Sequence, residues 1–344
     1  MKIALITDYL GRFGSKQRSK SYRSGMNIEK LNEIFLSQKC QLKFFDFTSC
    51  LELLKETEPH FILYTSSEDK GEHYKSYIED SIHLLSLSHH TCIPDFIFLR
   101  AHNNKVFMEM LRLHFKFSDV ELFQSKFAAT TKEINELNTL FPIVMKGPSG
   151  ALSKTVKKAN NKKEALLYFN SLAPKVQLKQ KVNEKLRRWR HRNNYNPEEL
   201  IRGKIVLQKF IPNIDVDWKV LVYYNSLFVL KRKNRKNDFR ASGSGLFSYT
   251  KDVPQKILDL AWKTRETLNV PHLSIDIAET SKGLGIFEFQ AIYFGTKTIE
   301  NSTFHFVKKN ESYQIIDSTV ELEEIFVKSC LDFINEKHKG IALL

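Results

Sequence analysis

The alternation of strand and helix patterns in the first hundred residues restricts the fold more than any other feature of the chain. Residues 26–38 and 74–88 repeat apolar side chains at helical spacing. Short apolar runs around them predict four strands, at residues 2–7, 42–47, 61–65 and 96–99. Such alternation is typical of a parallel sheet with helices on its faces, where ligands bind beyond the carboxyl ends of the strands. Two polar loops follow predicted strands, at residues 8–26 and 100–105.

Beyond residue 105 the pattern changes to helices mixed with antiparallel hairpins. One hairpin is predicted to join 217–224 to 226–231 across Asn225, and another to join 274–278 to 285–289. Helices are expected at 106–116, 131–140, 162–170, 253–268 and 321–336, and short strands at 120–123, 142–146 and 205–210. This mixture indicates an α+β arrangement in the C-terminal part.

The net charge of +14, from 53 lysines and arginines against 39 acidic residues, invites a nucleic-acid interpretation. The charge is concentrated, however. Residues 175–204 hold ten basic and three acidic residues, and residues 231–240 hold six basic and one acidic, so 40 residues carry +12 of the total. We therefore interpret the charge as local binding of phosphates and acids, which disfavours a general nucleic-acid surface.

Cysteine use and hydropathy indicate a cytoplasmic protein. The four cysteines, Cys40, Cys50, Cys92 and Cys330, show no C-x-x-C spacing and are expected to be reduced core thiols. No apolar run approaches the roughly 18 residues of a membrane span. The apolar N-terminal stretch also becomes polar too early for a signal peptide.

A loop of small residues follows a lysine at the end of a predicted strand, in the sequence Lys146-Gly147-Pro148-Ser149-Gly150. Small residues let backbone N–H groups approach phosphate oxygens, and the lysine adds positive charge. The Walker pattern is absent. An ordinary surface hairpin is the alternative interpretation.

Three oxygen-bearing side chains occupy the second predicted hairpin. Asp276 and Glu288 lie 12 residues apart on its two strands, and Glu288 and Gln290 share one face because side chains alternate along a strand. Carboxylate and carboxamide oxygens suit Mg²⁺, together with substrate phosphates. The alternative is a solvated strand face, although the apolar neighbours would leave buried carboxylates in need of partners.

Two basic segments have both a structural and a functional interpretation. Residues 231–240 lead into the Gly/Ser stretch 241–245, which can fold around an anion but can equally be a solvated loop. Residues 187–192, with Trp189 among the arginines, suit stacking and phosphate contact as well as they suit a solvated helix.

The histidines offer weaker signals. His89, His90 and His102 have no second cluster of ligands at regular spacing, so we expect surface or loop side chains and no metal. His102 lies next to Asn104-Lys105, which leaves a substrate role open.

The glycine loop, the basic run and the acidic hairpin, taken together, resemble the ATP-grasp superfamily. The closest likeness is to the branch of ribosomal-S6 modification ligase and glutathione synthetase. The resemblance implies a Rossmann-like pre-ATP-grasp domain followed by an ATP-grasp domain of two α+β subdomains. The implied boundaries are a pre-ATP-grasp domain at 1–100, a first segment of the main subdomain at 101–140, a lid subdomain at 141–212, and a metal and catalytic subdomain at 213–344.

The resemblance also implies roles for single residues. Lys105 and Lys146 resemble the two nucleotide lysines, and 147–154 resembles the mobile lid loop. The nucleotide contacts implied are Lys105, Lys146, Gly147, Ser149, Gly150, Ser153, Gln208, Lys209, Phe210, Ile211, Asp217 and Arg232. The catalytic residues implied are Arg240, Lys219 and Ser242, and the metal ligands are Asp276, Glu288 and Gln290.

Some positions depart from the family pattern. Gln290 stands where Asn is usual, Gln208 where Glu is frequent, and Lys219 where Arg is usual. The stretch 291–295, Ala-Ile-Tyr-Phe-Gly, replaces a proline-glycine stretch. This last difference makes the acceptor end of the site the hardest to assign.

The activity implied is that of an ATP-dependent carboxylate–amine ligase with Mg²⁺, or Mn²⁺ in its place. ATP would convert a small-molecule or saccharide carboxylate into an acylphosphate, which an amine co-substrate would convert into an amide. An anionic acceptor is expected near Arg12, Lys16, Arg18 and Arg23, and the pathway implied is surface-polysaccharide or peptide-type small-molecule assembly. A homodimer stays open. The alternatives are an ATP-grasp kinase and a non-catalytic polyanion-binding or RNA-binding protein, the last disfavoured by the acidic triad.

Overall fold

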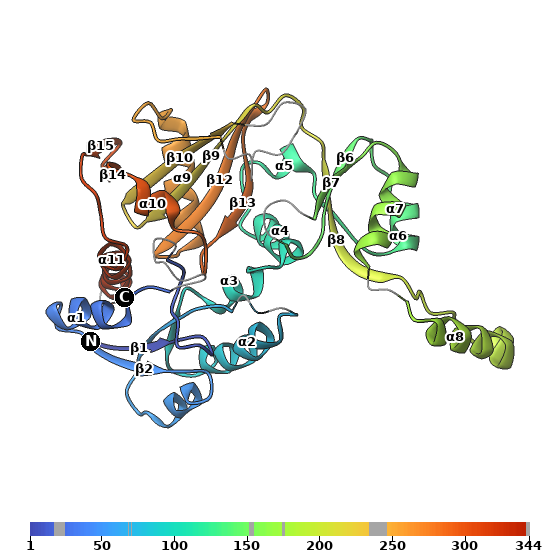
Figure 1. The fold of residues 1–344 in the computed structure, drawn as a ribbon, viewed down its shortest axis with the longest axis horizontal. Helices are drawn as coiled ribbons and strands as arrows, with labels where there is room; N and C mark the ends of the chain where they lie inside the picture. The colour runs from blue at the N-terminus through green and yellow to red at the C-terminus, as the bar shows by residue number, and fades with distance from the viewer. Residues whose placement is uncertain are drawn as a thin grey trace. The chain divides into compact units, whose positions relative to one another are not determined.

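The computed structural model describes residues 1–16, 25–67, 69, 71–150, 155–173, 176–233 and 246–341. It divides into two compact units (Figure 1). Unit 1 comprises residues 1–102 and 214–344, and unit 2 comprises residues 103–213. The four-part division implied by the family resemblance stays a prediction.

The N-terminal part of unit 1 is the predicted parallel α/β layer. Four parallel strands pair in the order β2-β1-β3-β4. Their bounds are β1 Lys2–Ile6, β2 Gln41–Phe45, β3 Phe61–Tyr64 and β4 Thr91–Ile93. The connections contain α1 Ile28–Ser37, the 3₁₀ helix η1 Cys50–Lys55 and α2 His73–Ser86. Periodicity therefore predicted the layer and three of its strands correctly.

The strand predicted at residues 96–99 is wrong. These residues begin a helix, α3 Phe96–Ala101, and the edge strand lies earlier, at β4. Asp95 caps the helix, since its side chain accepts a hydrogen bond from the backbone of Ile97. A short apolar run fits either a buried strand or a buried helix, and here the cap decides for the helix.

The sequence predicts histidines at the surface or in loops. His90 and His102 do lie in loops between elements, but both are buried rather than exposed. His90 Nδ1 accepts from the backbone N–H of His60 at 3.1 Å, so its Nε2 carries the proton and donates to the Leu53 carbonyl at 2.8 Å. His90 therefore has a structural role beneath the parallel sheet.

The C-terminal part of unit 1 is a largely antiparallel sheet in the order β13-β12-β9-β10-β14-β15, with β11 paired to β10. Both predicted hairpins are present, as β9–β10 and β12–β13. The bounds are β9 Val216–Tyr223, β10 Ser226–Lys233, β11 Phe247–Ser248, β12 His272–Thr280, β13 Gly283–Gln290, β14 His305–Lys309 and β15 Ser312–Ile316. The helices are α9 Gln255–Leu268, α10 Lys297–Asn301 and α11 Leu322–Ile341.

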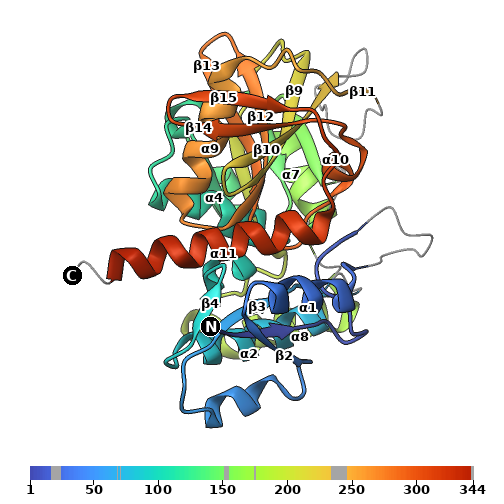
Figure 2. The same ribbon diagram turned by 90° about the vertical axis from the view of Figure 1, so that its left-hand side faces the viewer.

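Helix α11 joins the two sheets of unit 1. In Figure 2 it runs between the antiparallel sheet and the parallel layer. Its buried face, including Phe326 and Ile334, belongs to the same apolar core as Leu31 and Phe35 of α1 and Leu221 of β9. Because this core is continuous, the two layers of unit 1 are fixed with respect to each other.

Unit 2 is built on a four-stranded antiparallel sheet in the order β5-β8-β6-β7. The strands are β5 Lys126–Thr130, β6 Ile143–Lys146, β7 Val156–Ala159 and β8 Arg202–Lys209. The helices are α4 Lys105–His114, α5 Val120–Phe123, α6 Thr131–Glu136, α7 Lys162–Leu172 and α8 Leu178–His191, followed by the 3₁₀ turn η2 Arg192–Asn194.

Residues 120–123, predicted as a strand, form the single helical turn α5 instead. Phe123 is its only buried residue, and Gln124 ends the turn in the left-handed region at φ 46°. The run is too short for periodicity to separate the two alternatives.

Candidate functional site

The predicted metal residues lie side by side on one face of the antiparallel sheet. Asp276 on β12 is in register with Glu288 on β13 and with Lys219 on β9. Residues in antiparallel register project to the same face, as do residues two apart on one strand. The face also holds Asp217, Arg232, Ser274 and Gln290. A β-bulge between Asp276 and Ile277 sets the register of the two acids.

Arg232 is buried and binds two carboxylates of this face. Its Nε lies 2.5 Å from Asp217 Oδ1, and its Nη2 lies 2.9 Å from Asp217 Oδ2 and 2.8 Å from Asp276 Oδ2. Lys219 Nζ donates to Ser274 Oγ at 2.9 Å and lies 3.9 Å from Asp276 Oδ1. The register of the sheet thus brings charged side chains of β9, β10 and β12 together in one ion-pair network.

The network determines the charge of Asp276. Burial opposes ionisation, but Arg232 and Lys219 outweigh it and hold the pKa of the Asp276 carboxyl below its usual value. Burial likewise disfavours the charge of Arg232, yet Asp276 and Asp217 raise the pKa of its guanidinium. At neutral pH this part of the site therefore holds ionised groups.

The acidic residues fit a magnesium ion in part. Asp276 Oδ1 is buried and accepts no hydrogen bond from the described part of the chain. Glu288 Oε1 accepts from Gln290 Nε2 at 3.0 Å, which orients the two side chains toward each other. Within that same part, no cluster of three or more His, Cys, Asp or Glu residues is placed to hold a metal. A hard cation here would thus use two carboxylates, the Gln290 carboxamide and oxygens of its substrate.

In unit 2, Lys105 and the glycine loop contact each other. Lys105 is the first residue of α4, and its backbone N–H donates to the Pro148 carbonyl at 2.8 Å. Its Nζ donates to the Gly150 carbonyl, also at 2.8 Å. Gly150 has φ +121°, a conformation that residues with a side chain rarely adopt, and an added Cβ would lie 3.0 Å from Thr155. The structure therefore brings together two elements that lie more than 40 residues apart in the sequence.

Lys146 lies at the end of β6, above a buried network that sequence reasoning missed. Its Nζ is 3.9 Å from Glu109 Oε1. Glu109 also binds Arg112, with Nε to Oε2 at 3.0 Å, and accepts from Ser125 Oγ at 3.0 Å. Gln208 on β8 donates to that same Ser125 hydroxyl at 2.9 Å. The spacing of Glu109 and Arg112 on a predicted helix was the one available signal for this network.

Comparison with known proteins rests on structure alone. No protein-family model and no curated protein matches the sequence. The crystal structure of a D-cycloserine synthetase, DcsG, matches with a TM-score of 0.53 and 10% identity over 96% of this chain and 99% of that chain. The ATP-grasp ligase PsnB, complexed with a minimal precursor, matches with a TM-score of 0.50 and 8% identity over 96% and 98%. The chain has the ATP-grasp fold.

The predicted nucleotide contacts at 208–211 lie at the end of β8 and just beyond it. Gln208 is buried on the strand and Lys209 ends it. Phe210 follows, with its backbone N–H donating to the Pro142 carbonyl at 3.3 Å and Lys158 Nζ lying 4.2 Å from its ring centre. Ile211 comes next along the chain. A cavity of about 200 Å³ borders Leu207, Gln208 and Lys209 on the side of β5.

Several predicted residues lie outside the described part of the chain, namely Ser153, Arg240, Ser242, Arg18 and Arg23. Arg12 and Lys16, predicted to hold an anionic acceptor, already contact carboxylates. Arg12 Nη2 lies 2.9 Å from Asp8 Oδ2, and Lys16 Nζ lies 2.8 Å from the buried carboxylate of Glu323. An acceptor would have to share these cations with their partners.

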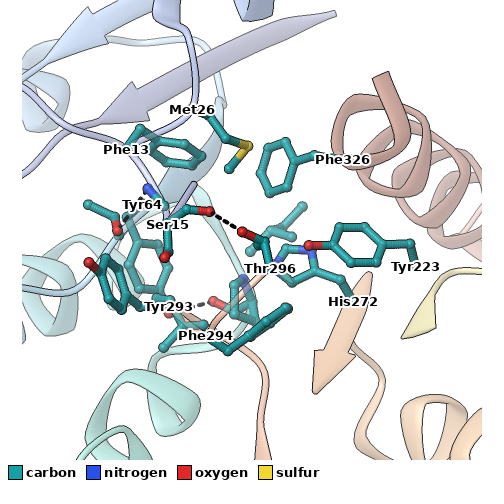
Figure 3. A pocket seen from close by; sticks show the side chains of 15 residues that line it. Phe13, Ser15, Met26, Tyr64, Tyr223, His272, Tyr293, Phe294, Thr296 and Phe326 are labelled. Atoms are coloured by element: carbon teal, nitrogen blue, oxygen red, sulfur yellow. Dashed lines mark hydrogen bonds between the residues drawn. The ribbon is translucent and has the colours of Figure 1, made fainter. Parts of the chain in front are cut away.

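An aromatic cavity of about 40 Å³ in unit 1 was not predicted. It opens at the carboxyl ends of the parallel strands, where the parallel layer meets the antiparallel sheet (Figure 3). Its walls include Phe13, Tyr64, Tyr223, His272, Tyr293, Phe294 and Phe326. Thr296 Oγ1 closes one side by donating to the Ser15 carbonyl at 3.0 Å. Its lining comes from eight separate stretches of the chain, and the aromatic pair 293–294 was the only sequence signal.

His272 is one of the polar groups of this cavity, together with the hydroxyls of Ser15, Thr65 and Thr296. Burial lowers the pKa of its imidazole to about 4, so the ring is neutral at physiological pH. Its Nδ1 is buried and makes no hydrogen bond to the described residues. The cavity therefore combines largely aromatic walls with a neutral imidazole that can donate or accept a hydrogen bond.

Proposed function

We propose that the chain is an ATP-dependent carboxylate–amine ligase. The observation that carries the proposal is the ionised network on the antiparallel sheet, with Asp276 directly opposite Glu288 and beside Arg232, in a chain with the ATP-grasp fold. A substrate carboxylate oxygen would attack the γ-phosphorus of ATP, which gives an acylphosphate and ADP. An amine would then attack the acyl carbon, with loss of phosphate and of the amine proton, to give an amide.

The residues divide between binding and charge stabilisation. Asp276, Glu288 and Gln290 would hold Mg²⁺, which supplies positive charge to the phosphate oxygens when it is bound. Lys105 and Lys146 would hold the phosphates, because Lys105 begins α4, Lys146 ends β6, and both lie next to the glycine loop. Lys219 lies in the same row as Asp276 and would face the transferred group. Arg240 and Ser242 stay predictions for this role.

The aromatic cavity is our proposed site for one of the two co-substrates. Its place at the carboxyl ends of β1 and β3 is where parallel sheets bind ligands. At about 40 Å³ it has room only for a small apolar group of that co-substrate, and His272 Nδ1 offers one hydrogen-bonding atom. A role in surface-polysaccharide or peptide-type small-molecule assembly rests on the family resemblance alone, and a cytoplasmic location rests on the cysteine use and hydropathy of the sequence.

The test measures ADP release with Mg-ATP against panels of carboxylates and amines. We expect ADP and phosphate to form together with an amide, and only when both co-substrates are present. Glu288→Gln should lower the rate about 100-fold or more, because it removes a charge that acts on the phosphates. Glu279→Gln on the same hairpin is the matched control, since Glu279 is exposed and pairs with Lys256 at 2.5 Å.

Two outcomes would contradict the proposal. Full activity of Glu288→Gln would remove the acidic pair from the reaction. A stable phosphorylated product, formed without any amine, would assign the chain to the kinases instead. A simpler first measurement is the melting temperature, which millimolar Mg-ATP should raise if the native state binds it.

A further inference from the structure

Helix α8 of unit 2 exposes its apolar residues. Leu178, Val182, Leu186 and Trp189 have exposed fractions of 77%, 47%, 55% and 73%. Their spacing of four, four and three residues puts them on one stripe of the helix. In Figure 1, α8 extends away from the sheet of unit 2. None of the four belongs to the apolar core of that unit.

The opposite side of the helix packs against the segment that follows it, residues 195–198, and is polar. Glu184 is buried and is the only buried residue of α8. Its carboxylate accepts from Tyr195 Oη at 2.6 Å, from Arg188 Nε at 3.1 Å and from the Glu198 backbone at 3.1 Å. At about 3.6 residues per turn, Glu184 lies roughly opposite the apolar stripe. The usual arrangement of a surface helix is therefore inverted.

Positive charge borders the stripe on both sides. The helix carries six lysines and arginines and one glutamate. Lys181 and Lys185 flank one edge of the stripe, and Lys179 and Arg190 flank the other. Long basic side chains of this kind can reach past an apolar surface to phosphates while their stems stay in apolar contact.

We propose that α8 binds the anionic headgroup surface of a phospholipid bilayer. The stripe would enter the boundary between headgroups and acyl chains, and the flanking cations would contact lipid phosphates. Three features of α8 support a bilayer over other polyanions. The helix as a whole has a low mean hydropathy, and its narrow apolar stripe ends in an exposed tryptophan. Basic residues also lie along both edges of this stripe. Exposed aliphatic side chains would add nothing to the binding of nucleic-acid phosphates. This proposal is independent of the proposed enzymatic activity.

The test uses the full-length chain and vesicles that contain 30% phosphatidylglycerol in phosphatidylcholine, with pure phosphatidylcholine vesicles as the reference. Co-sedimentation and tryptophan emission report binding, because Trp189 is far more exposed than Trp218. We expect binding to the anionic vesicles, a blue shift of the emission, and weaker binding at 0.5 M salt than at 0.1 M. The double variant Leu186→Gln, Trp189→Gln should lose about tenfold or more in vesicle partitioning.

Asn183→Gln is the matched control, since Asn183 is exposed on the same helix but away from the stripe. Its vesicle binding should equal that of the parent chain, and thermal unfolding should show that both variants fold. Equal binding to the two vesicle types, or unchanged binding by the stripe variant, would overturn the proposal. So would an absence of vesicle binding accompanied by stripe-dependent binding of an RNA oligonucleotide or an acidic peptide.

Discussion

The two units each contain a buried arginine bound by two carboxylates, but the surroundings differ. In unit 2, Arg112 is bound by Glu109 and by Asp119, with Nη1 to Oδ2 at 2.6 Å, and the phenyl ring of Phe123 covers its guanidinium. In unit 1, Arg232 is bound by Asp217 and Asp276, and Asp276 lies opposite Glu288 and Lys219 on the same face of the sheet. The same set of charged groups, one arginine and two carboxylates, thus forms a closed structural cluster in unit 2 and a cluster next to the candidate metal site in unit 1.

The comparison of the two arginine clusters predicts that the largest loss of stability follows a substitution in unit 2. Arg112→Ala would leave two buried carboxylates without their counter-charge, and we expect a loss of about 3–5 kcal/mol in the free energy of unfolding. Urea denaturation measures it. Lys132→Ala, which removes an exposed ion pair to Glu136, should change stability by about 0.5 kcal/mol or less. A loss below about 1 kcal/mol for Arg112→Ala would show that the cluster is not closed.

In unit 1 the corresponding change should affect activity more than stability. Asp276→Asn leaves Arg232 bound to both oxygens of Asp217, so we expect a stability loss of no more than about 1–2 kcal/mol. ADP release should fall about 100- to 1,000-fold, equivalent to about 3–4 kcal/mol in the barrier. Asp259→Asn, at a half-buried acid away from the site that pairs with Lys308 and accepts from Tyr313, is the control. If Asp276→Asn kept its activity but lost much of its stability, the Arg232 cluster would have a purely structural role, as the Arg112 cluster does.

The β12–β13 hairpin shows how much of the site could be predicted. The spacing of Asp276, Glu288 and Gln290 placed them on a hairpin, and the structure brings Asp276 opposite Glu288 by means of a bulge that the spacing did not predict. Lys105 begins helix α4 and Lys146 ends strand β6, and at both positions the apolar pattern of the sequence changes. These features depend on local pattern, which sequence reports directly.

The missed features depend on contacts between distant segments. Glu109 acquires its role only when folding brings Ser125 and Lys146 next to it, and no local pattern encodes those contacts. The same holds for the aromatic cavity. For α8 the signal was present, since residues 178–189 carry an apolar stripe, but the basic residues at 187–192 suited phosphate contact and a solvated helix equally well and hid the stripe.

His272 sharpens the comparison because it is buried with no opposite charge in contact. Its pKa of about 4 in the folded protein lies below the usual 6.5, so the unfolded chain binds more protons between these values. Stability should therefore fall as the pH decreases from about 6.5 to 4, by up to about 1.4 kcal/mol per unit. His272→Gln should reduce this slope in urea denaturation at pH 7, 6 and 5. An unchanged slope would contradict the burial of a neutral imidazole.

The smallest predicted effect concerns the glycine loop beside Lys105. Gly150→Ala places a side chain at φ +121°, which costs about 1–3 kcal/mol and would displace the carbonyl that Lys105 binds. We expect a rise of a few-fold in KM for ATP. Gly283→Ala has nearly the same backbone strain, at φ +120°, but lies in the β12–β13 turn with open space around it. If both variants raised KM equally, the loop would have no special link to the nucleotide.

The bulge between Asp276 and Ile277 has a consequence for how the chain can change length. From the turn up to the pair Ile277–Ile286 the hairpin is regular, and one extra residue then brings Glu288 opposite Asp276. If the strands paired without the bulge while Phe287 stayed in place, Asp276 would face Phe287, and Glu288 and Gln290 would point to the other side of the sheet. The site therefore depends on Phe287 being accommodated as the extra residue. Deletion of Phe287 should leave Glu288 opposite Asp276 in a regular hairpin, and insertions at the tip of the hairpin, beyond the regular pairs, should also leave the acids in register.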